Sequence, residues 1–365
     1  MRLLVALILL AGCSAAPVDP PDSEASSIPL LAPGLTMATT LYGGGRTADL
    51  EAGPRATLEA AIDRGLGGFA LYVDWVDLEP EPGRYTLDDL TAKLDALDRL
   101  GVVPFLNITV GDSEDLNLPP GVPDGEALGD PEVIERFGRV LDRVVPLLLA
   151  GDGFFLGLGN EMGGSLDDDR PAREAYAAFV EAARERVHGI EPRLAVGVTL
   201  TTFDVRTGSP TYRAMRAVSD AVAVNHAPIP ADFVVLDVED IRADFRETID
   251  AYGEGPLLIQ ELTCPNPASM GASDAWQADC FRELFAEIEA TPQIRFASVF
   301  TFLDFDAATC TAVQDALFQD ELDDLPDDVA QRLADYLCGL GVVNVDGSPS
   351  PAWDVIVERT EALTR

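Results

Sequence analysis

Strand-length apolar runs recur eight times along this chain, and an amphipathic stretch of helical length follows most of them. The runs are rich in β-branched residues, which is typical of buried strands in a parallel sheet. The predicted strands are Thr36–Tyr42, Gly68–Val73, Val102–Thr109, Phe154–Gly159, Leu194–Leu200, Ala221–Asn225, Pro256–Gln260 and Arg295–Phe302. Regular alternation of strands with helices predicts repeated βα units.

The helical patterns complete the prediction of the fold class. They cover Pro54–Arg64, Leu87–Leu100, Pro131–Leu149, Ala172–His188, Asp240–Tyr252, Asp274–Glu289 and Ala352–Leu363. Eight strands in α/β alternation predict a (β/α)8 TIM barrel, and the usual size of that fold matches residues 35–365. The acidic stretch Asp320–Asp328 is interpreted as an exposed insertion after the last strand.

A doubly wound sheet is the alternative architecture, and such sheets commonly carry a phosphate-binding loop. Gly157-Leu158-Gly159 lacks the third glycine at position 162, and the pattern GxxxxGK[ST] is absent. The barrel therefore remains the favoured fold.

Charge and histidine content exclude several classes of function. The chain has 63 acidic and 25 basic residues, a net charge of −38, so it repels phosphate backbones and we expect no nucleic-acid partner. The only histidines are His188 and His226, which argues against a histidine-based zinc site and a metal-dependent barrel hydrolase. We therefore expect no metal and no organic cofactor.

The amino terminus has the pattern of an export signal. A single arginine precedes the apolar run Leu3–Ala11, which is too short to cross a bilayer and is typical of a signal peptide. Leu10-Ala11-Gly12-Cys13 resembles the bacterial lipobox, and this resemblance implies lipid attachment at Cys13 after cleavage. An ordinary signal peptide with an incidental cysteine is the alternative.

This terminus defines the predicted domain organisation. Residues 1–12 form the signal, residues 13–34 a tether rich in Pro, Ser and Asp, and residues 35–365 the barrel domain. We expect a monomer in the bacterial cell envelope, outside the cytoplasm, that touches the membrane only through its lipid.

Four further cysteines are predicted to form disulfides. Cys264, Cys280, Cys310 and Cys338 are even in number and contain no CxxC pair. In an exported protein this favours two disulfides, with three possible connectivities. Local pairing, 264 with 280 and 310 with 338, is the preferred hypothesis.

Two glutamates occupy the places where a barrel of this kind keeps its chemistry. Asn160-Glu161 follows the fourth predicted strand, and Glu261 follows the seventh. The carboxyl ends of barrel strands form the active-site face, so both side chains are expected at its mouth. Glycoside hydrolysis needs such a pair, one to protonate the leaving oxygen and one to attack or to activate water. A structural carboxylate paired with arginine at the rim is the alternative for each.

In this order and spacing the sequence resembles clan A of the glycoside hydrolases, which are retaining (β/α)8 enzymes. The resemblance implies that Glu161 is the acid/base, Glu261 the nucleophile and Asn160 a ligand of the sugar 2-hydroxyl. Two further segments are similar to the clan: WVDLEPEPGRY, from Trp75 to Tyr85, and VDGSPSPAW, from Val345 to Trp353.

Other polar or aromatic residues near predicted strand ends are candidate substrate contacts. They are Asp74, Trp75, Asn107, His226 and Asp304. For Trp75 packing of the loop is an equally good interpretation, and for His226 the alternatives are a ligand contact, a bond to a glutamate or a core position.

The sequence also departs from the clan. The second strand, Gly68–Val73, carries no arginine, and Phe300–Asp304 lacks the tryptophan often found after the last strand. The resulting prediction is a retaining hydrolase acting on β-linked oligo- or polysaccharides. A glycan-binding lipoprotein that has lost turnover is the alternative.

Overall fold

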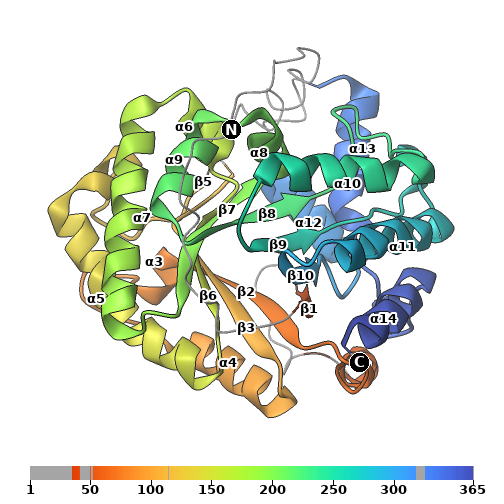
Figure 1. The fold of residues 1–365 in the computed structure, drawn as a ribbon, viewed down its shortest axis with the longest axis horizontal. Coiled ribbons are helices and arrows are strands. Elements are labelled where there is room, and N and C mark those ends of the chain that lie inside the picture. Colours follow the sequence, from red (N-terminus) through yellow and green to blue (C-terminus); the bar gives the residue numbers. More distant parts are fainter. Residues whose placement is uncertain (1–34, 42–49, 51, 114, 318–324, 365) are drawn as a thin grey trace.

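The computed structural model describes residues 35–41, 50, 52–113, 115–317 and 325–364. Eight parallel strands form a closed barrel, confirming the predicted (β/α)8 fold (Figure 1). The barrel strands are β1 (Thr36–Thr40), β2 (Gly68–Asp74), β3 (Val103–Thr109), β6 (Phe155–Asn160), β7 (Ala195–Thr201), β8 (Ala221–His226), β9 (Leu257–Leu262) and β10 (Ile294–Val299). Pairing of β1 with β10 and of β3 with β6 closes the circle.

One long helix follows each strand and covers the outside of the barrel (Figure 1). These helices are α2 (Ala52–Ile62), α4 (Asp88–Leu100), α5 (Pro131–Ala150), α7 (Arg170–Ile190), α9 (Pro210–Val218), α10 (Val238–Tyr252), α11 (Asp274–Ala290) and α14 (Pro351–Thr364). Helix α9 was not predicted from the sequence. It is nine residues long, shorter than the roughly 10 to 12 residues over which a helical pattern can be told from other structure.

Further helices and strands lie in the loops that follow the barrel strands. They are α3 (Trp75–Leu78), β4 (Gly111–Asp112), β5 (Asp115–Leu116), η3 (Glu126–Gly129), α6 (Gly163–Asp167), α8 (Thr202–Thr207), η4 (Ala268–Met270), α12 (Ala307–Leu317) and α13 (Asp327–Cys338). The predicted acidic insertion is thus flanked by two helices. No described helix combines the length and apolarity needed to cross a membrane.

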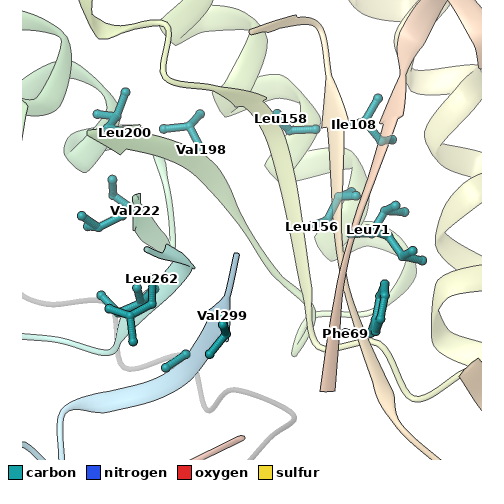
Figure 2. Packing of buried hydrophobic residues seen from close by; sticks show 14 of the residues in the cluster. Phe69, Leu71, Ile108, Leu156, Leu158, Val198, Leu200, Val222, Leu262 and Val299 are labelled. Atoms are coloured by element: carbon teal, nitrogen blue, oxygen red, sulfur yellow. The ribbon is translucent and has the colours of Figure 1, made fainter. Parts of the chain in front are cut away.

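The two faces of each strand belong to different cores. Outward side chains such as Leu71, Ile108 and Leu156 pack beneath the helices in the large cluster of Figure 2. Inward side chains form a smaller core, in which the ring of Phe105 stacks on Phe155 and Phe296 at centroid distances of 4.6 and 5.0 Å. The period-2 alternation of a strand explains this division. Aromatic rings close one end of the barrel interior and leave polar residues at the other.

Two disulfides hold the segments after β9 and β10. Cys264 pairs with Cys280 and Cys310 pairs with Cys338, which are the local pairings preferred from the sequence. The first joins the loop after β9 to α11, and the second joins α12 to α13. Such bonds persist in oxidising compartments, so they indicate a protein outside the reducing cytoplasm. Cys13 and the tether lie outside the described residues.

Removing either disulfide should lower the free energy of unfolding, because the unfolded chain gains conformational entropy when the bond no longer constrains it. The bonds close loops with separations of 16 and 28 residues, each worth about 3 kcal/mol in the chain-entropy model. Urea unfolding of Cys264→Ala/Cys280→Ala and of Cys310→Ser/Cys338→Ser, compared with wild type, measures the loss. A decrease below about 1 kcal/mol would contradict this account.

Candidate active site

A group of polar side chains lies at the carboxyl end of the barrel, and we call it the acidic cup. It consists of Tyr72 from β2, Asp112 from β4, Asn160 and Glu161 from the end of β6, Asn225 from β8 and Glu261 from β9. All belong to strand ends or to residues that follow them. This is the face on which barrels of this type carry their active sites.

A bulge in β6 brings Asn160 into the cup. Strict alternation from inward-facing Phe155 would turn Asn160 outward, toward the helices. The register of β6 against β7 instead shifts between Gly157 and Asn160, and Gly159 adopts φ +116° at the shift. Only glycine adopts that conformation readily, and a Cβ there would lie 2.5 Å from the hydroxyl of Tyr176. The glycine therefore places Asn160 next to Glu161 at the mouth.

A second irregularity lets β9 present two consecutive residues to the centre. The β9 register shifts against both neighbouring strands around Gln260 and Glu261. Gln260 is fully buried, and above it Glu261 accepts a hydrogen bond of 2.7 Å from the hydroxyl of Tyr72. Bulges commonly re-aim side chains next to functional sites.

Amide side chains hold Glu161 and Asn160 in place. Nδ2 of Asn225 donates to Oε1 of Glu161 at 2.8 Å and to Oδ1 of Asn160 at 3.1 Å. Nε2 of Gln260 donates to the same Asn160 oxygen at 2.8 Å, and Nδ2 of Asn160 donates to Asp112 at 3.0 Å. Glu161 also has φ +52°, an uncommon backbone conformation for a residue with a side chain. Such strain is found preferentially at functional sites.

The carboxyl groups of the cup hold their protons more tightly than ordinary carboxyls do. Burial raises the pKa of Glu161, and the nearby charge of Asp112 adds to this effect. Burial also raises the pKa of Glu261, with a second contribution from the charge of Glu161. Because like charges oppose each other's ionisation, a proton held by one glutamate favours the charged form of the other. One acid and one base in a common pocket is what proton-transfer catalysis needs.

Tyr72 and Asp112 belong to the cup, but neither was among the site residues predicted from the sequence. Tyr72 lies two residues before Asp74 on β2, so strand alternation puts both on one face, a signal that was available. Asp112 follows β3 in a two-residue strand that pairs with β5 and meets β6 at Asn160. No apolar run marks so short an element, and its position came only from the structure.

A third residue missed from the sequence, Tyr336, brings the insertion after β10 close to the cup. Its hydroxyl lies 3.1 Å from Oγ1 of Thr263, just beyond β9. Burial raises the pKa of Tyr336, and the charges of Glu261 and Glu161 contribute to the rise. Helix α13 is held there by packing of Leu333 against Phe233 and Met270. Helix α13 thus forms part of the surroundings of the glutamates.

Of the two interpretations left open for Trp75, the structure favours packing over a sugar platform. Its side chain is fully buried, in contact with Phe137, and its Nε1 donates to Glu79 at 3.2 Å. Glu79 also accepts from the backbone N–H of Gly83 at 2.7 Å and from Nε of Arg136 at 3.0 Å. The WVDLEPEPG segment is therefore a packed structural unit around a buried glutamate.

Asn107 and His226 are also buried and bonded to protein groups, which favours structural roles for them over substrate contacts. Asn107 has no exposed surface, and its amide bonds Gln260 and both backbone groups of Gly159. His226 alternates with inward-facing Asn225, so it points outward, where its ring packs on Phe245 of α10. Its Nδ1 lies 3.1 Å from Oγ1 of Thr202, and burial lowers its pKa to about 3.

The two remaining candidates differ in their distance from the cup. Asp74 is half-buried beside it, accepts hydrogen bonds from Thr109 and Asn117, and adds negative charge near Asp112. Asp304 lies on the segment after β10, where its backbone N–H donates to the carbonyl of Val343 at 2.8 Å. Among the described residues, no hydrogen bond or ion pair joins Asp304 to Glu161 or Glu261. The described residues contain no group of three His, Cys, Asp or Glu side chains suited to a metal ion.

Solved structures of glycosidases share this fold with the chain. The chain is similar to an exo-β-1,4-mannosidase from Opitutaceae bacterium strain TAV5, with 18% identity and a TM-score of 0.64 over 90% of this chain and 60% of that one. It is also similar to a GH5_18 protein from Bifidobacterium longum in complex with Manβ1-4GlcNAc, with 13% identity and a TM-score of 0.65 over 90% of this chain and 77% of the other. A β-glucosidase, 1317, has 16% identity and a TM-score of 0.57 over 84% and 87%.

The fold is that of clan A glycosidases. This confirms the resemblance found in the sequence at the level of architecture. No family model and no curated protein sequence matches the chain. The chain spans 60% of the length of the exo-mannosidase.

Tyr72→Phe should show whether the phenol controls the charge of Glu261. The hydrogen bond from Tyr72 favours the ionised form and lowers the Glu261 pKa, so its loss raises that pKa further. If ionised Glu261 is needed for turnover, the acid limb of the pH profile of kcat/KM moves to higher pH. A hydrogen bond to a charged group is worth about 1.5–3 kcal/mol, so activity below the limb should fall at least tenfold. An unchanged acid limb would contradict this role.

Proposed function

We propose that this protein is a retaining β-glycoside hydrolase in which Glu261 is the nucleophile and Glu161 the acid/base. The observation that supports the proposal best is the pairing of two partly buried glutamates at the carboxyl end of the barrel, each with its own hydrogen-bond partner. Tyr72 holds one oxygen of Glu261 and leaves the other for attack. Asn225 holds one oxygen of Glu161, and the second can meet the glycosidic oxygen.

The proposed reaction proceeds in two displacements. Glu261 attacks the anomeric carbon, the bond to the leaving oxygen breaks, and the proton of Glu161 passes to that oxygen. Glu161, now ionised, takes a proton from water, whose oxygen attacks the anomeric carbon and releases Glu261. The charge of Glu261 disappears in the ester, which lowers the proton affinity of Glu161 between the steps. Asn160 would contact the substituent on C2, the ring carbon next to the reacting carbon, and Asp74 would contact a sugar hydroxyl.

The named activities of the similar structures support a β-linked hexoside as the substrate. One is described as an exo-β-1,4-mannosidase, another holds Manβ1-4GlcNAc, and a third is described as a β-glucosidase. We infer that an oligosaccharide with a β-linked hexose is the substrate, and that neither a metal nor an organic cofactor takes part. A panel of aryl β-mannosides, β-glucosides and β-galactosides with their disaccharides gives the direct assay.

Variants of the two glutamates test the assigned roles. Glu261→Ala should abolish turnover of every substrate. Glu161→Ala should lower kcat/KM on a disaccharide about 10²–10⁴-fold but spare the first step for dinitrophenyl glycosides, whose leaving group needs no proton. Azide added to Glu161→Ala should then yield a β-glycosyl azide from a β-glycoside, identified by NMR.

Glu174→Gln is the matched control for loss of a carboxylate, because Glu174 is an exposed residue of α7 paired with Arg170. It should retain wild-type kinetics. An α-glycosyl azide, or full activity in Glu261→Ala, would overturn the roles. A wild-type protein that binds the glycans without cleaving any of them would establish the glycan-binding alternative.

We further propose that Cys13 carries a lipid that holds the domain at the bacterial envelope through the tether of residues 13–34. Lipobox processing requires the cysteine, so Cys13→Ser should leave an unprocessed precursor without lipid. Detergent phase partitioning and intact-protein mass spectrometry of the expressed full chain measure both changes. Wild-type partitioning of the Cys13→Ser protein would refute the anchor.

A further inference from the structure

Asp112 is the third carboxylate of the cup, and only one of its two oxygens accepts hydrogen bonds from the described residues. Its Oδ1 accepts from Nδ2 of Asn160 at 3.0 Å and from Oγ of Ser113 at 3.4 Å. Within the described ranges, Oδ2 has no hydrogen-bond partner. The side chain is only half-buried, so a ligand in the cup can reach this oxygen. In its ionised form Asp112 can only accept hydrogen bonds, so a donor on the ligand pairs with Oδ2 and favours that ionised form.

Charge in the cup is uniformly negative. The electrostatic influences on Asp112, Glu161 and Glu261 come from one another and from Asp74, Asp115 and Asp204. In the part of the chain that the structure describes, none of the three carboxyls forms an ion pair with arginine or lysine. Their hydrogen-bond donors are the neutral side chains Tyr72, Asn160, Asn225 and Ser113. Carboxylates brought together without cations favour a ligand that supplies positive charge.

Asn225 gives a second, independent indication of a donor-rich ligand. Its side chain is 7% exposed, and both hydrogen bonds of its Nδ2 are used within the cup. Its Oδ1 is buried without a hydrogen-bond partner among the described atoms. Buried acceptors of this kind are rare because each costs desolvation energy. A bound molecule with N–H or O–H groups would lower that cost.

The position of Asp112 identifies the part of a sugar that it would meet. It pairs with the end of β6 at Asn160, the residue that precedes Glu161, and its Oδ1 accepts a hydrogen bond from the Asn160 side chain at 3.0 Å. In the proposed function both glutamates act at the anomeric carbon and the oxygen bonded to it. The exocyclic group nearest that centre is the substituent on the adjacent ring carbon, C2. Asp112 is therefore placed to receive a donor attached to C2.

We propose that the sugar cleaved by this protein is a 2-amino-2-deoxy hexose with a free amine, and that Asp112 binds its ammonium group. This inference rests on the proposed glycosidase function and names its substrate class. An ammonium group carries three donors and one positive charge, so it satisfies Oδ2 and reduces repulsion among the carboxylates. N-acetylation removes that charge and leaves one donor, so an acetylated sugar is a poor substrate.

The decisive comparison uses three aryl β-glycosides that differ only at C2. These are the 4-nitrophenyl derivatives of glucosamine, glucose and N-acetylglucosamine, assayed at a pH where the amine is protonated. The glucosaminide should exceed the glucoside in kcat/KM at least about tenfold, as expected for a hydrogen bond to a charged group. Asp112→Asn should reduce the glucosaminide-to-glucoside ratio to near one. Glu174→Gln, which removes an exposed carboxylate of α7 outside the cup, should keep the wild-type ratio.

Each outcome separates the two proposals. Hydrolysis of the glucoside with equal or higher kcat/KM than the glucosaminide, or a ratio unchanged in Asp112→Asn, overturns the amino-sugar proposal and leaves the glycosidase function intact. If no glycoside is cleaved, the proposed function fails, and titration calorimetry of the wild-type protein with glucosamine and glucose still decides the ligand. Tighter binding of glucosamine that weakens with added salt supports the amino-sugar site, and equal binding refutes it.

Discussion

A single buried glutamine, Gln260, connects four strands of the barrel directly beneath the glutamate pair. Its Oε1 accepts from Asn107 of β3 at 2.8 Å and from Thr199 of β7 at 2.7 Å, while its Nε2 donates to Asn160 of β6. Buried polar groups are stable only when they are paired, so these bonds hold the strands at one relative height. The network separates the phenylalanine-filled end of the barrel from the charged cup.

The chemistry of the cup follows from this support. Asn160 and Asn225 are oriented by bonds to Gln260, to one another and to Glu161, so the acid side chain has little freedom to swing away. Burial in this site raises the pKa values of Glu161 and Glu261, and no arginine or lysine of the described residues forms an ion pair with either. Within the described part of the chain, the phenol of Tyr72 is the one side-chain hydrogen-bond donor to Glu261, and it lies on a strand where the clan often has arginine. A neutral donor in that place leaves the negative charge of the cup uncompensated, which is the basis for a cationic substrate.

The sequence predicted the barrel well because strand parity and length are local properties. All eight strands were predicted, and most of their predicted ends lie within about two residues of the observed ends. Each strand is a run of apolar residues bounded by polar ones or glycine. The alternation of side chains along a strand also predicts that His226 points outward and Tyr72 inward, once other residues of the same strand are assigned to the barrel interior. Trp75 was ambiguous, because a tryptophan after a strand packs on helices as readily as it faces a ligand.

Order and residue type along the chain thus determined the fold class and the placement of two glutamates at the ends of the fourth and seventh barrel strands, and they favoured the local disulfide pairing that the structure shows. Only the tertiary structure decided which neighbours those glutamates have. The β6 and β9 bulges reverse strand parity at Asn160 and Glu261, and a bulge is defined by register against another strand. Asp112 enters the cup because the two-residue strand β4 pairs with the end of β6 at Asn160. Contacts between distant segments depend on packing that no local pattern encodes, and they set the charge and the free hydrogen-bond acceptors of this site.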